Sequence, residues 1–168
     1  AIKELQKMGL TVVMLTGDNE KTAESIGREA GVDRVIAGVL PDGKETVIRE
    51  LQKYGRVAMV GDGINDAPVL AGADVGAAMG SGADAAIEAA DVVFMKADLT
   101  SIPISVKIAR KANIVSKENI VFALAVKILV MILGLFGIAS MWLAVFADTG
   151  VAMLCVLNSI RMLYMKTE

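Results

Sequence analysis

Hydrophobic and polar positions follow two rhythms over the first hundred residues of the chain. Short apolar runs bounded by polar turns are typical of buried strands, whereas apolar residues spaced three or four apart are typical of helices. The pattern predicts helices over residues 1–9, 19–31, 41–55, 64–73 and 82–90, and strands over residues 10–18, 34–39, 56–63, 74–80 and 91–95. Strands that alternate with helices predict an α/β domain over residues 1–100, with a parallel sheet covered on both faces.

The pattern changes after residue 100. Residues 101–118 are basic and amphipathic, and they predict a connector helix. Two apolar runs follow, over residues 119–138 and 141–163, and each has the ~20 residues that a helix needs to cross a bilayer. Residues 164–168 form a short polar tail. The second part of the chain therefore predicts two transmembrane helices joined by a tight turn.

Basic residues flank this apolar pair on both sides. Arg110, Lys111 and Lys117 precede it, and Arg161 and Lys166 follow it. Because cytoplasmic loops carry the excess of lysine and arginine, both ends of the pair are expected on the cytoplasmic side. We therefore expect a multi-pass protein of the plasma or inner membrane, with its α/β domain and its C-terminus in the cytoplasm.

Composition excludes several other kinds of site. The net charge is −2, so there is no basic field for nucleic-acid binding, and no nucleic-acid partner is expected. Histidine is absent, which removes imidazole from any metal or acid–base proposal. The single cysteine, Cys155, allows no internal disulfide and is interpreted as a packing residue.

One polar cluster follows the strand that ends at Val60, in the sequence GDGIND. Gly61 and Gly63 permit a sharp turn and let the backbone approach an anion. Asp62 is placed to coordinate Mg²⁺, which takes carboxylate and phosphate oxygens together. Asp66 can accept hydrogen bonds from the turn, and Asn65 can donate to a phosphoryl oxygen. A glycine-rich turn with a helix cap is the alternative interpretation.

A second cluster follows Leu15, in the sequence TGD. The Thr16 hydroxyl and the backbone N–H groups of Gly17 and Asp18 can hold a phosphoryl oxygen as charge develops on it. A cap on the next helix would explain the same residues. Because ligands of parallel α/β sheets bind beyond the carboxyl ends of the strands, the two clusters are expected to form one site.

Lys44 lies in GVLPDGKE, which comes close to a P-loop. A P-loop needs serine or threonine after the lysine, but Glu45 stands there, and Pro41 removes a backbone donor. We therefore reject a P-loop. Lys44 is interpreted as a point charge that can reach a phosphorylated carboxylate, with a solvated surface lysine as the alternative.

The two apolar runs contain two charged residues, Lys127 and Asp148. A charge in lipid costs ~2.5–3.5 kcal/mol on insertion scales unless it is paired or faces a bundle interior. Both charges lie about eight residues, or ~12 Å, into their helices, so an interaction across the hairpin is expected. A mid-membrane carboxylate is a cation ligand, and a nearby ammonium can compete with the cation for it. A structural pair, or a lysine that snorkels to the interface, is the alternative.

The polar clusters resemble motifs of the haloacid-dehalogenase superfamily, which has a Rossmann-type parallel sheet. The segments MLTGDN, LPDGK and MVGDGINDAPVLAGADVGAAMGSGADAAIEAADVVFM look like part of the phosphorylation domain of P-type ATPases. The resemblance implies that Asp62 binds Mg²⁺ and that Lys44 contacts the aspartyl phosphate. It also implies that Thr16, Gly17 and Asp18 line the phosphoryl site and that Asn65 and Asp66 complete it, with ATP as the phosphoryl donor.

The membrane part resembles the zinc/cadmium/lead exporters of this family. They carry a lysine in the penultimate helix and a D-x-G motif in the last helix, as Lys127 and Asp148-Thr149-Gly150 do here. The resemblance implies Zn²⁺, Cd²⁺ or Pb²⁺ as cargo, bound by Asp148 with Lys127 as the counter-charge. Copper pumps carry other signatures in these helices, so a copper pump, or a pump for another cation, is the weaker alternative.

The family's nucleophile, the aspartate of D-K-T-G-T, is not found in the sequence. We therefore expect the C-terminal portion of a longer pump, which lacks its N-terminal remainder and is inactive alone, since covalent catalysis needs the nucleophile. A truncated, catalytically silent module anchored in the membrane is the alternative of a different class.

Overall fold

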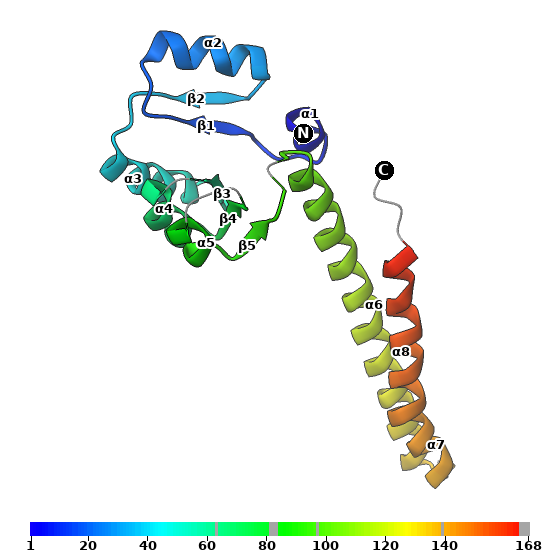
Figure 1. Ribbon diagram of the computed structural model, residues 1–168. Helices are drawn as coiled ribbons and strands as arrows, with labels where there is room; N and C mark the ends of the chain where they lie inside the picture. Colours follow the sequence, from blue (N-terminus) through cyan, green and yellow to red (C-terminus); the bar gives the residue numbers. More distant parts are fainter. Residues whose placement is uncertain (63, 81–83, 97, 139, 165–168) are drawn as a thin grey trace. The chain divides into compact units, whose positions relative to one another are not determined.

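The computed structural model describes residues 1–62, 64–80, 84–96, 98–138 and 140–164, and the chain divides into two compact units, Ala1–Pro103 and Ile104–Glu168. In the first unit, helices and strands alternate as the hydrophobic pattern predicts (Figure 1). Its helices are α1 (Ile2–Lys7), α2 (Glu20–Ala30), α3 (Pro41–Gln52), α4 (Ala67–Gly72) and α5 (Asp84–Ala89), and a short 3-10 turn, η1 (Ile64–Asp66), precedes α4. Its strands are β1 (Val13–Leu15), β2 (Arg34–Ile36), β3 (Ala58–Gly61), β4 (Val75–Met79) and β5 (Val92–Phe94).

All strand pairs of this unit are parallel, which confirms the α/β prediction. The strands form two sheets, β1-β2 and β3-β4-β5, rather than the one sheet that the alternation suggests. Among the described residues no strand joins β1 to β3, and each of these two strands lies at an edge of its sheet. The two polar clusters follow these two edge strands.

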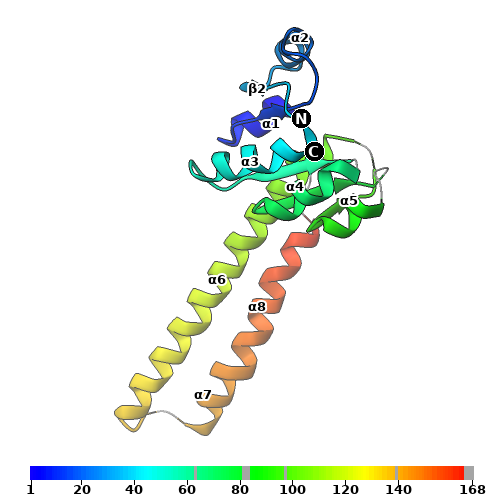
Figure 2. The ribbon, with the colours of Figure 1, turned by 90° about the vertical axis from the view of Figure 1, so that its left-hand side faces the viewer.

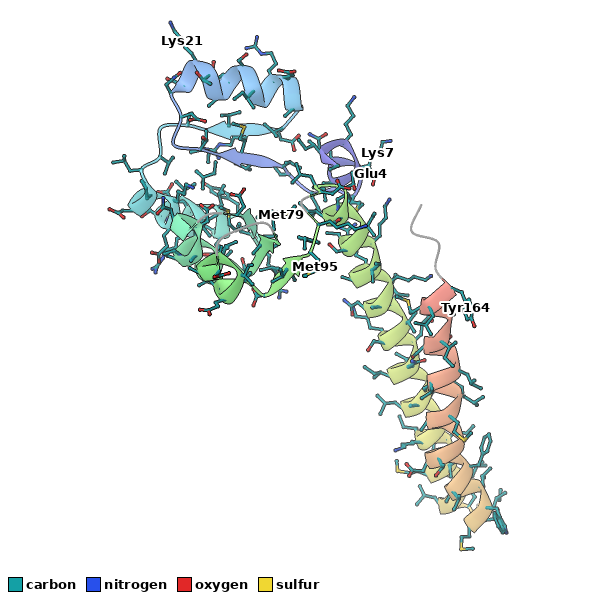
Figure 3. The ribbon with its side chains drawn as sticks, in the orientation of Figure 1. Glu4, Lys7, Lys21, Met79, Met95 and Tyr164 are labelled. Carbon is teal, nitrogen blue, oxygen red and sulfur yellow. The ribbon has the colours of Figure 1, made fainter. Side chains whose placement is uncertain are left out.

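The core of the first unit lies between the three-stranded sheet and its helices. Leu70 of α4, Ala78 of β4 and Ala86 of α5 are fully buried and pack together. Small residues in β4 let the helices approach the sheet closely, and Met79 at its end is 8% exposed. Met95, directly after β5, is 85% exposed (Figure 3). Burial is thus concentrated around β4, next to the strand that carries the GDGIND cluster.

The second unit consists of two antiparallel helical segments that lie side by side (Figures 1 and 2). The long helix α6 (Ser101–Leu135) is unbroken, and it contains the connector helix predicted over residues 101–118 and most of the span predicted over residues 119–138. No glycine or proline interrupts residues 104–133, which explains the continuity. The helix ends before Gly137, which has a φ of 71°.

The returning segment contains α7 (Met141–Val145), a π-helical turn η2 (Phe146–Gly150), α8 (Val151–Ile160) and a 3-10 turn η3 (Arg161–Tyr164). By length and composition, α6 and the segment Met141–Tyr164 can each cross a membrane. The predicted tail over residues 164–168 lies outside the described residues except for Tyr164.

Candidate functional site

Lys44 and Asp66 meet at the start of α4. The Nζ atom of Lys44 donates to Oδ1 of Asp66 over 2.7 Å, and the two side chains are 18% and 13% exposed. Lys44 lies in α3, 22 residues from Asp66 in the sequence, so folding brings together two residues that the sequence predicted for one site. Because both side chains are largely shielded from water, their hydrogen bond holds them in a fixed position before any ligand binds.

Gly61, the last residue of β3, makes room for Asp66. A Cβ atom on residue 61 would lie 2.9 Å from the Cβ and 3.0 Å from the Oδ2 of Asp66. Such distances are shorter than van der Waals contact, so any side chain there would push Asp66 away from the strand end. Gly61 was predicted to let another group come close to the backbone. The group that comes close here is the carboxylate of Asp66.

Asp62 and Asn65 lie on either side of the turn after β3, and both are exposed. Gly63, also predicted for this site, lies outside the described residues. Asp62 is thus a carboxylate that is open to solvent, while Asp66 is engaged with lysine. Among the described residues, no group of three or more acidic, cysteine or histidine side chains could hold a metal by itself. Mg²⁺ suits such a site, because it is bound through one or two carboxylates together with substrate phosphates and water.

The Thr16–Asp18 turn follows β1. The Thr16 hydroxyl donates to Oδ2 of Asp18 over 2.9 Å, and the N–H of Asp18 donates back to that hydroxyl over 3.2 Å. The carbonyls of the same two residues accept from Val39 and Gly38, which fixes the turn against the chain after β2. Asp18 is exposed, and the turn is held by its own hydrogen bonds together with those from Gly38 and Val39. That this turn shares one site with Lys44 and Asp66 stays a prediction.

Lys127 and Asp148 face each other in the second unit. The Nζ atom of Lys127 lies 3.0 Å from Oδ1 of Asp148, so the predicted interaction across the hairpin is present. The two side chains are 55% and 75% exposed on the protein. Both residues lie within the two helices that are apolar enough for a membrane. The functional roles of both residues stay a prediction.

Asp148 lies in the π-helical turn η2. Such turns widen a helix locally and are frequent at functional sites. Gly150 ends this turn, and a Cβ atom on it would lie 2.6 Å from Cδ2 of the Phe146 ring. The glycine of the D-x-G motif therefore lets the Phe146 ring lie across the widened turn that carries Asp148.

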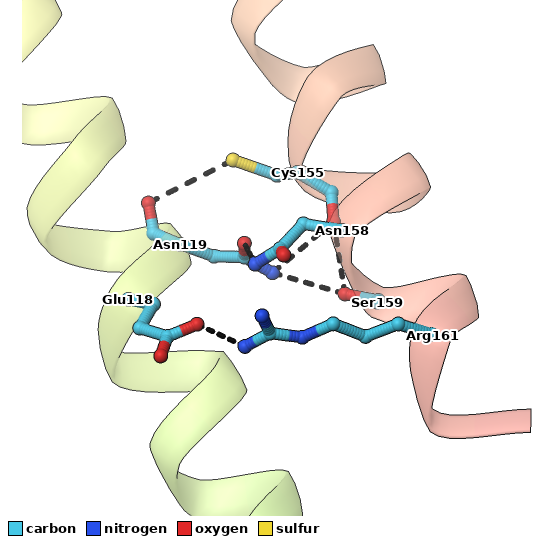
Figure 4. Close-up of polar contacts among 6 residues, drawn as sticks. All are labelled: Glu118, Asn119, Cys155, Asn158, Ser159 and Arg161. Atoms are coloured by element: carbon cyan, nitrogen blue, oxygen red, sulfur yellow. Dashed lines mark hydrogen bonds and ion pairs between the residues drawn. The ribbon is translucent and has the colours of Figure 1, made fainter. Parts of the chain in front are cut away.

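The polar cluster that joins α6 to α8 was not among the sequence predictions (Figure 4). Its members are Asn119, Asn158, Ser159 and Cys155, with an ion pair between Glu118 and Arg161 beside them. The asparagines in the two apolar runs are a signal for such a cluster, because asparagine is costly in an apolar helix unless it finds a hydrogen-bond partner. These amide and hydroxyl groups are neutral, so they are less conspicuous in an apolar run than Lys127 and Asp148.

Comparison with known proteins agrees with this geometry. Two family models, both described as haloacid dehalogenase-like hydrolase, match residues 1–74 and residues 52–103. A zinc-transporting ATPase of Synechocystis is 48% identical over 96% of this chain and 23% of its own length. A probable cadmium-transporting ATPase of Listeria monocytogenes is 45% identical over 98% of this chain and 24% of its own length. The chain thus spans about a quarter of the curated relatives that it matches.

Solved structures give the same result. The crystal structure of a zinc-transporting PIB-type ATPase in its E2.Pi state is 40% identical to this chain, with a TM-score of 0.92. The match covers 96% of this chain and 27% of the solved chain. The chain belongs to the P-type ATPase family, in the branch that includes zinc- and cadmium-transporting members.

Proposed function

We propose that this chain is the C-terminal part of an ATP-driven efflux pump for divalent heavy-metal ions, and that zinc and cadmium are its cargo. The observation that carries the proposal is the Lys127–Asp148 pair, with 3.0 Å between Nζ and Oδ1, in two helices apolar enough for a membrane. The similar proteins are named as zinc or cadmium transporters, which supports these two ions. Lead enters the proposal only through the resemblance of the D-x-G helix.

The pair supports transport through competition for one carboxylate. A divalent cation bound at Asp148 displaces the ammonium of Lys127, and the ammonium neutralises the carboxylate when the cation leaves. Because an unpaired carboxylate in lipid is costly, the empty state is stabilised by the lysine. This exchange lowers the barrier to releasing a tightly held ion without leaving a bare charge in the membrane.

The first unit would handle the phosphoryl group. Asp62 and the incoming phosphate would hold Mg²⁺, which supplies charge neutralisation at the phosphoryl oxygens. Lys44, kept in place by Asp66, would face the acyl phosphate, and Asn65 would donate to one of its oxygens. Thr16, Gly17 and Asp18 would present a hydroxyl and backbone donors to the same group.

In this proposal ATP is the phosphoryl donor, and the nucleophilic aspartate comes from a part of the pump outside this chain. The open edges of β1 and β3 support this arrangement, because each has backbone hydrogen-bonding groups for a further strand. A strand added there would end beside both polar clusters. The other parts of the pump are thus its structural partners as well as its catalytic ones.

The basic residues before and after the helix pair support a cytoplasmic first unit and C-terminus, in the plasma or inner membrane. This orientation puts the phosphoryl site on the side where ATP is available. The direction of transport, efflux, is proposed from the resemblance to zinc, cadmium and lead exporters.

The test uses the full-length pump in lipid. Asp148→Ala is expected to lose zinc-stimulated ATP hydrolysis at least tenfold, because the cation loses its carboxylate. Thr149→Ala is the matched control, since the neighbouring Thr149 is also exposed and is expected to keep the stimulation. Asp62→Asn is expected to abolish phosphoenzyme formation while the protein still folds. Unchanged zinc stimulation in Asp148→Ala would overturn the transport assignment.

A further inference from the structure

Asn119 of α6 is the centre of a hydrogen-bonded cluster with α8 (Figure 4). Its Nδ2 donates to the carbonyl of Cys155 over 3.2 Å and to Oγ of Ser159 over 2.9 Å. Its Oδ1 accepts from Nδ2 of Asn158 over 2.8 Å, and its backbone carbonyl accepts from the Cys155 thiol over 3.7 Å. Four contacts from one residue therefore tie the two helices together.

The cluster lies in the seam between the helices. From residue 107 to the end of α6, the less exposed residues recur at spacings of three and four, as in a coiled coil: Val115, Asn119, Ala123, Val126, Val130 and Leu133. The returning segment shows the same spacing, and both Cys155 and Asn158 belong to it. A seam of small and β-branched residues packs almost equally well after a slip of one turn. A polar residue in such a seam selects one register, because a slip would leave its amide without partners.

The seam also connects the cluster to the ion pair. Lys127 follows Asn119 by eight residues, or ~12 Å of helix, and Asp148 precedes Cys155 and Asn158 by seven and ten residues, or ~10–15 Å. The cluster and the ion pair are therefore compatible with one antiparallel register. Lys127 and Asp148 each lie next to a seam residue, Val126 and Ala147, so their own position depends on the seam.

We propose that Asn119 is a positioning residue, whose amide clamp on α8 fixes the register that puts Lys127 opposite Asp148. Glu118 and Arg161 add an ion pair beside the clamp, but they are about half exposed and contribute less selectivity. The clamp itself follows from the contacts alone. Its consequence for ion release rests on the proposed function.

Cross-linking in the full-length protein in lipid measures the register directly. A Cys155→Ser background removes the native thiol from the returning helix, and Lys127→Cys is combined in turn with Asp148→Cys, Ala144→Cys or Ala152→Cys. With Asn119 present, the cross-link to position 148 is expected to dominate. Asn119→Val is expected to shift the yield toward the neighbouring turns about three- to fivefold, the ratio that corresponds to one interhelical hydrogen bond in a bilayer.

The matched control is Asn113→Val, because Asn113 is an exposed asparagine of the same helix. It is expected to leave the distribution of cross-links unchanged. A role in general stability would lower all three yields together, and an unshifted ratio in Asn119→Val overturns the proposal. If Asn119→Val fails to accumulate in the membrane, Asn158→Val removes one of the clamp's hydrogen bonds and is expected to shift the ratio in the same direction.

Hydrolysis provides the second measurement, with the native residues at positions 127, 148 and 155. Asn119→Val is expected to lower zinc-stimulated hydrolysis several-fold and to add little in a Lys127→Ala background, because both changes then act through the same pair. Full additivity contradicts a positioning role. The cross-linking needs neither metal nor ATP, so a pump without zinc stimulation refutes the proposed function and leaves the register result standing.

Discussion

The two units of the chain each contain a lysine–aspartate pair, and the surroundings of the two pairs differ. Lys44 and Asp66 lie 2.7 Å apart with side chains 18% and 13% exposed. Lys127 and Asp148 lie 3.0 Å apart with side chains 55% and 75% exposed. The protein itself removes water from the first pair, while the second pair depends on whatever surrounds the two helices.

This difference separates stability from function. Removing one partner of a shielded pair strongly destabilises the fold, because the remaining charge has lost both its partner and most of its contact with water. A pair that the protein leaves exposed costs little to break in water or detergent and much more in lipid. The first pair is therefore part of a rigid frame, whereas the second can separate at little cost where water surrounds it, as the proposed function requires.

The largest expected effect comes from Asp66→Ala. It leaves Lys44 unpaired in a shielded position, and we expect the first unit to lose about 3–5 kcal/mol of stability. In detergent, the corresponding change Asp148→Ala is expected to cost at most about 1 kcal/mol in the second unit. Hydrogen exchange of the amides of β3 and β4 in the full-length protein measures the first effect, and exchange of the α8 amides measures the second.

A double substitution checks the cause. Lys44→Met combined with Asp66→Leu leaves no charge behind, so much of the lost protection of β3 and β4 is expected to return. Equal losses of protection in Asp66→Ala and Asp148→Ala would contradict the claim that shielding by the protein distinguishes the two pairs.

Local patterns were enough to predict the order of the elements and the parallel pairing. Hydrophobic periodicity and turn residues act within about ten residues, and they indicated where the strands and helices of the first unit lie. The pair Lys127–Asp148 was also predictable, because two opposite charges in two apolar runs have few other ways to be stabilised.

Features that depend on contacts distant in the sequence were not predictable in the same way. The Lys44–Asp66 contact depends on how α3 packs beside α4, and the split into two sheets depends on which strands pair, since β1 pairs with β2 and β3 pairs with β4. α6 runs unbroken across residue 118, where the change in composition marks the predicted start of the membrane span. Helical hydrogen bonds do not depend on the solvent around the side chains, so a helix can continue from water into lipid.

The next effect concerns the glycine beside each aspartate. Gly61→Ala is expected to destabilise the first unit by about 1–3 kcal/mol, because the new Cβ meets the backbone-anchored Cβ of Asp66 at 2.9 Å. Gly150→Ala meets the Phe146 ring at 2.6 Å, and a ring on an exposed helix surface can rotate away. Hydrogen exchange around β3 and around α8 in the two variants measures the difference.

A second substitution that removes the clashing group distinguishes Gly150→Ala from Gly61→Ala. Phe146→Ala should restore the normal exchange of α8 in the Gly150→Ala variant, whereas Asp66→Ala keeps the clashing Cβ and should not rescue Gly61→Ala. Gly55→Ala is the control, since a Cβ on residue 55 would meet nothing within 4 Å. If Gly61→Ala is as mild as Gly55→Ala, Asp66 is not held against the strand end.

A third carboxylate, Asp98, is held by hydrogen bonds from a threonine. Its Oδ2 accepts from the Thr100 hydroxyl over 2.6 Å and its Oδ1 from the Thr100 N–H over 2.9 Å, just before α6 begins. These bonds, the one from the hydroxyl first, lower the pKa of Asp98 below its ordinary value. Because the pKa is lower in the folded than in the unfolded chain, this contribution to stability is present above the ordinary pKa. It is lost as the pH falls through the folded-state pKa.

Thr100→Val gives the smallest expected effect. It removes the hydroxyl donor and keeps the backbone donor, so the pKa of Asp98 is expected to rise part of the way toward its ordinary value. A carboxyl NMR titration of ¹³C-labelled aspartate in the full-length protein measures this shift, with Thr46→Val on the exposed surface of α3 as the control. Asp98 is exposed, so hydrogen bonds rather than burial must fix its pKa. An unshifted titration would mean that solvent cancels these bonds, and the same screening would then apply to the exposed Lys127–Asp148 pair outside lipid.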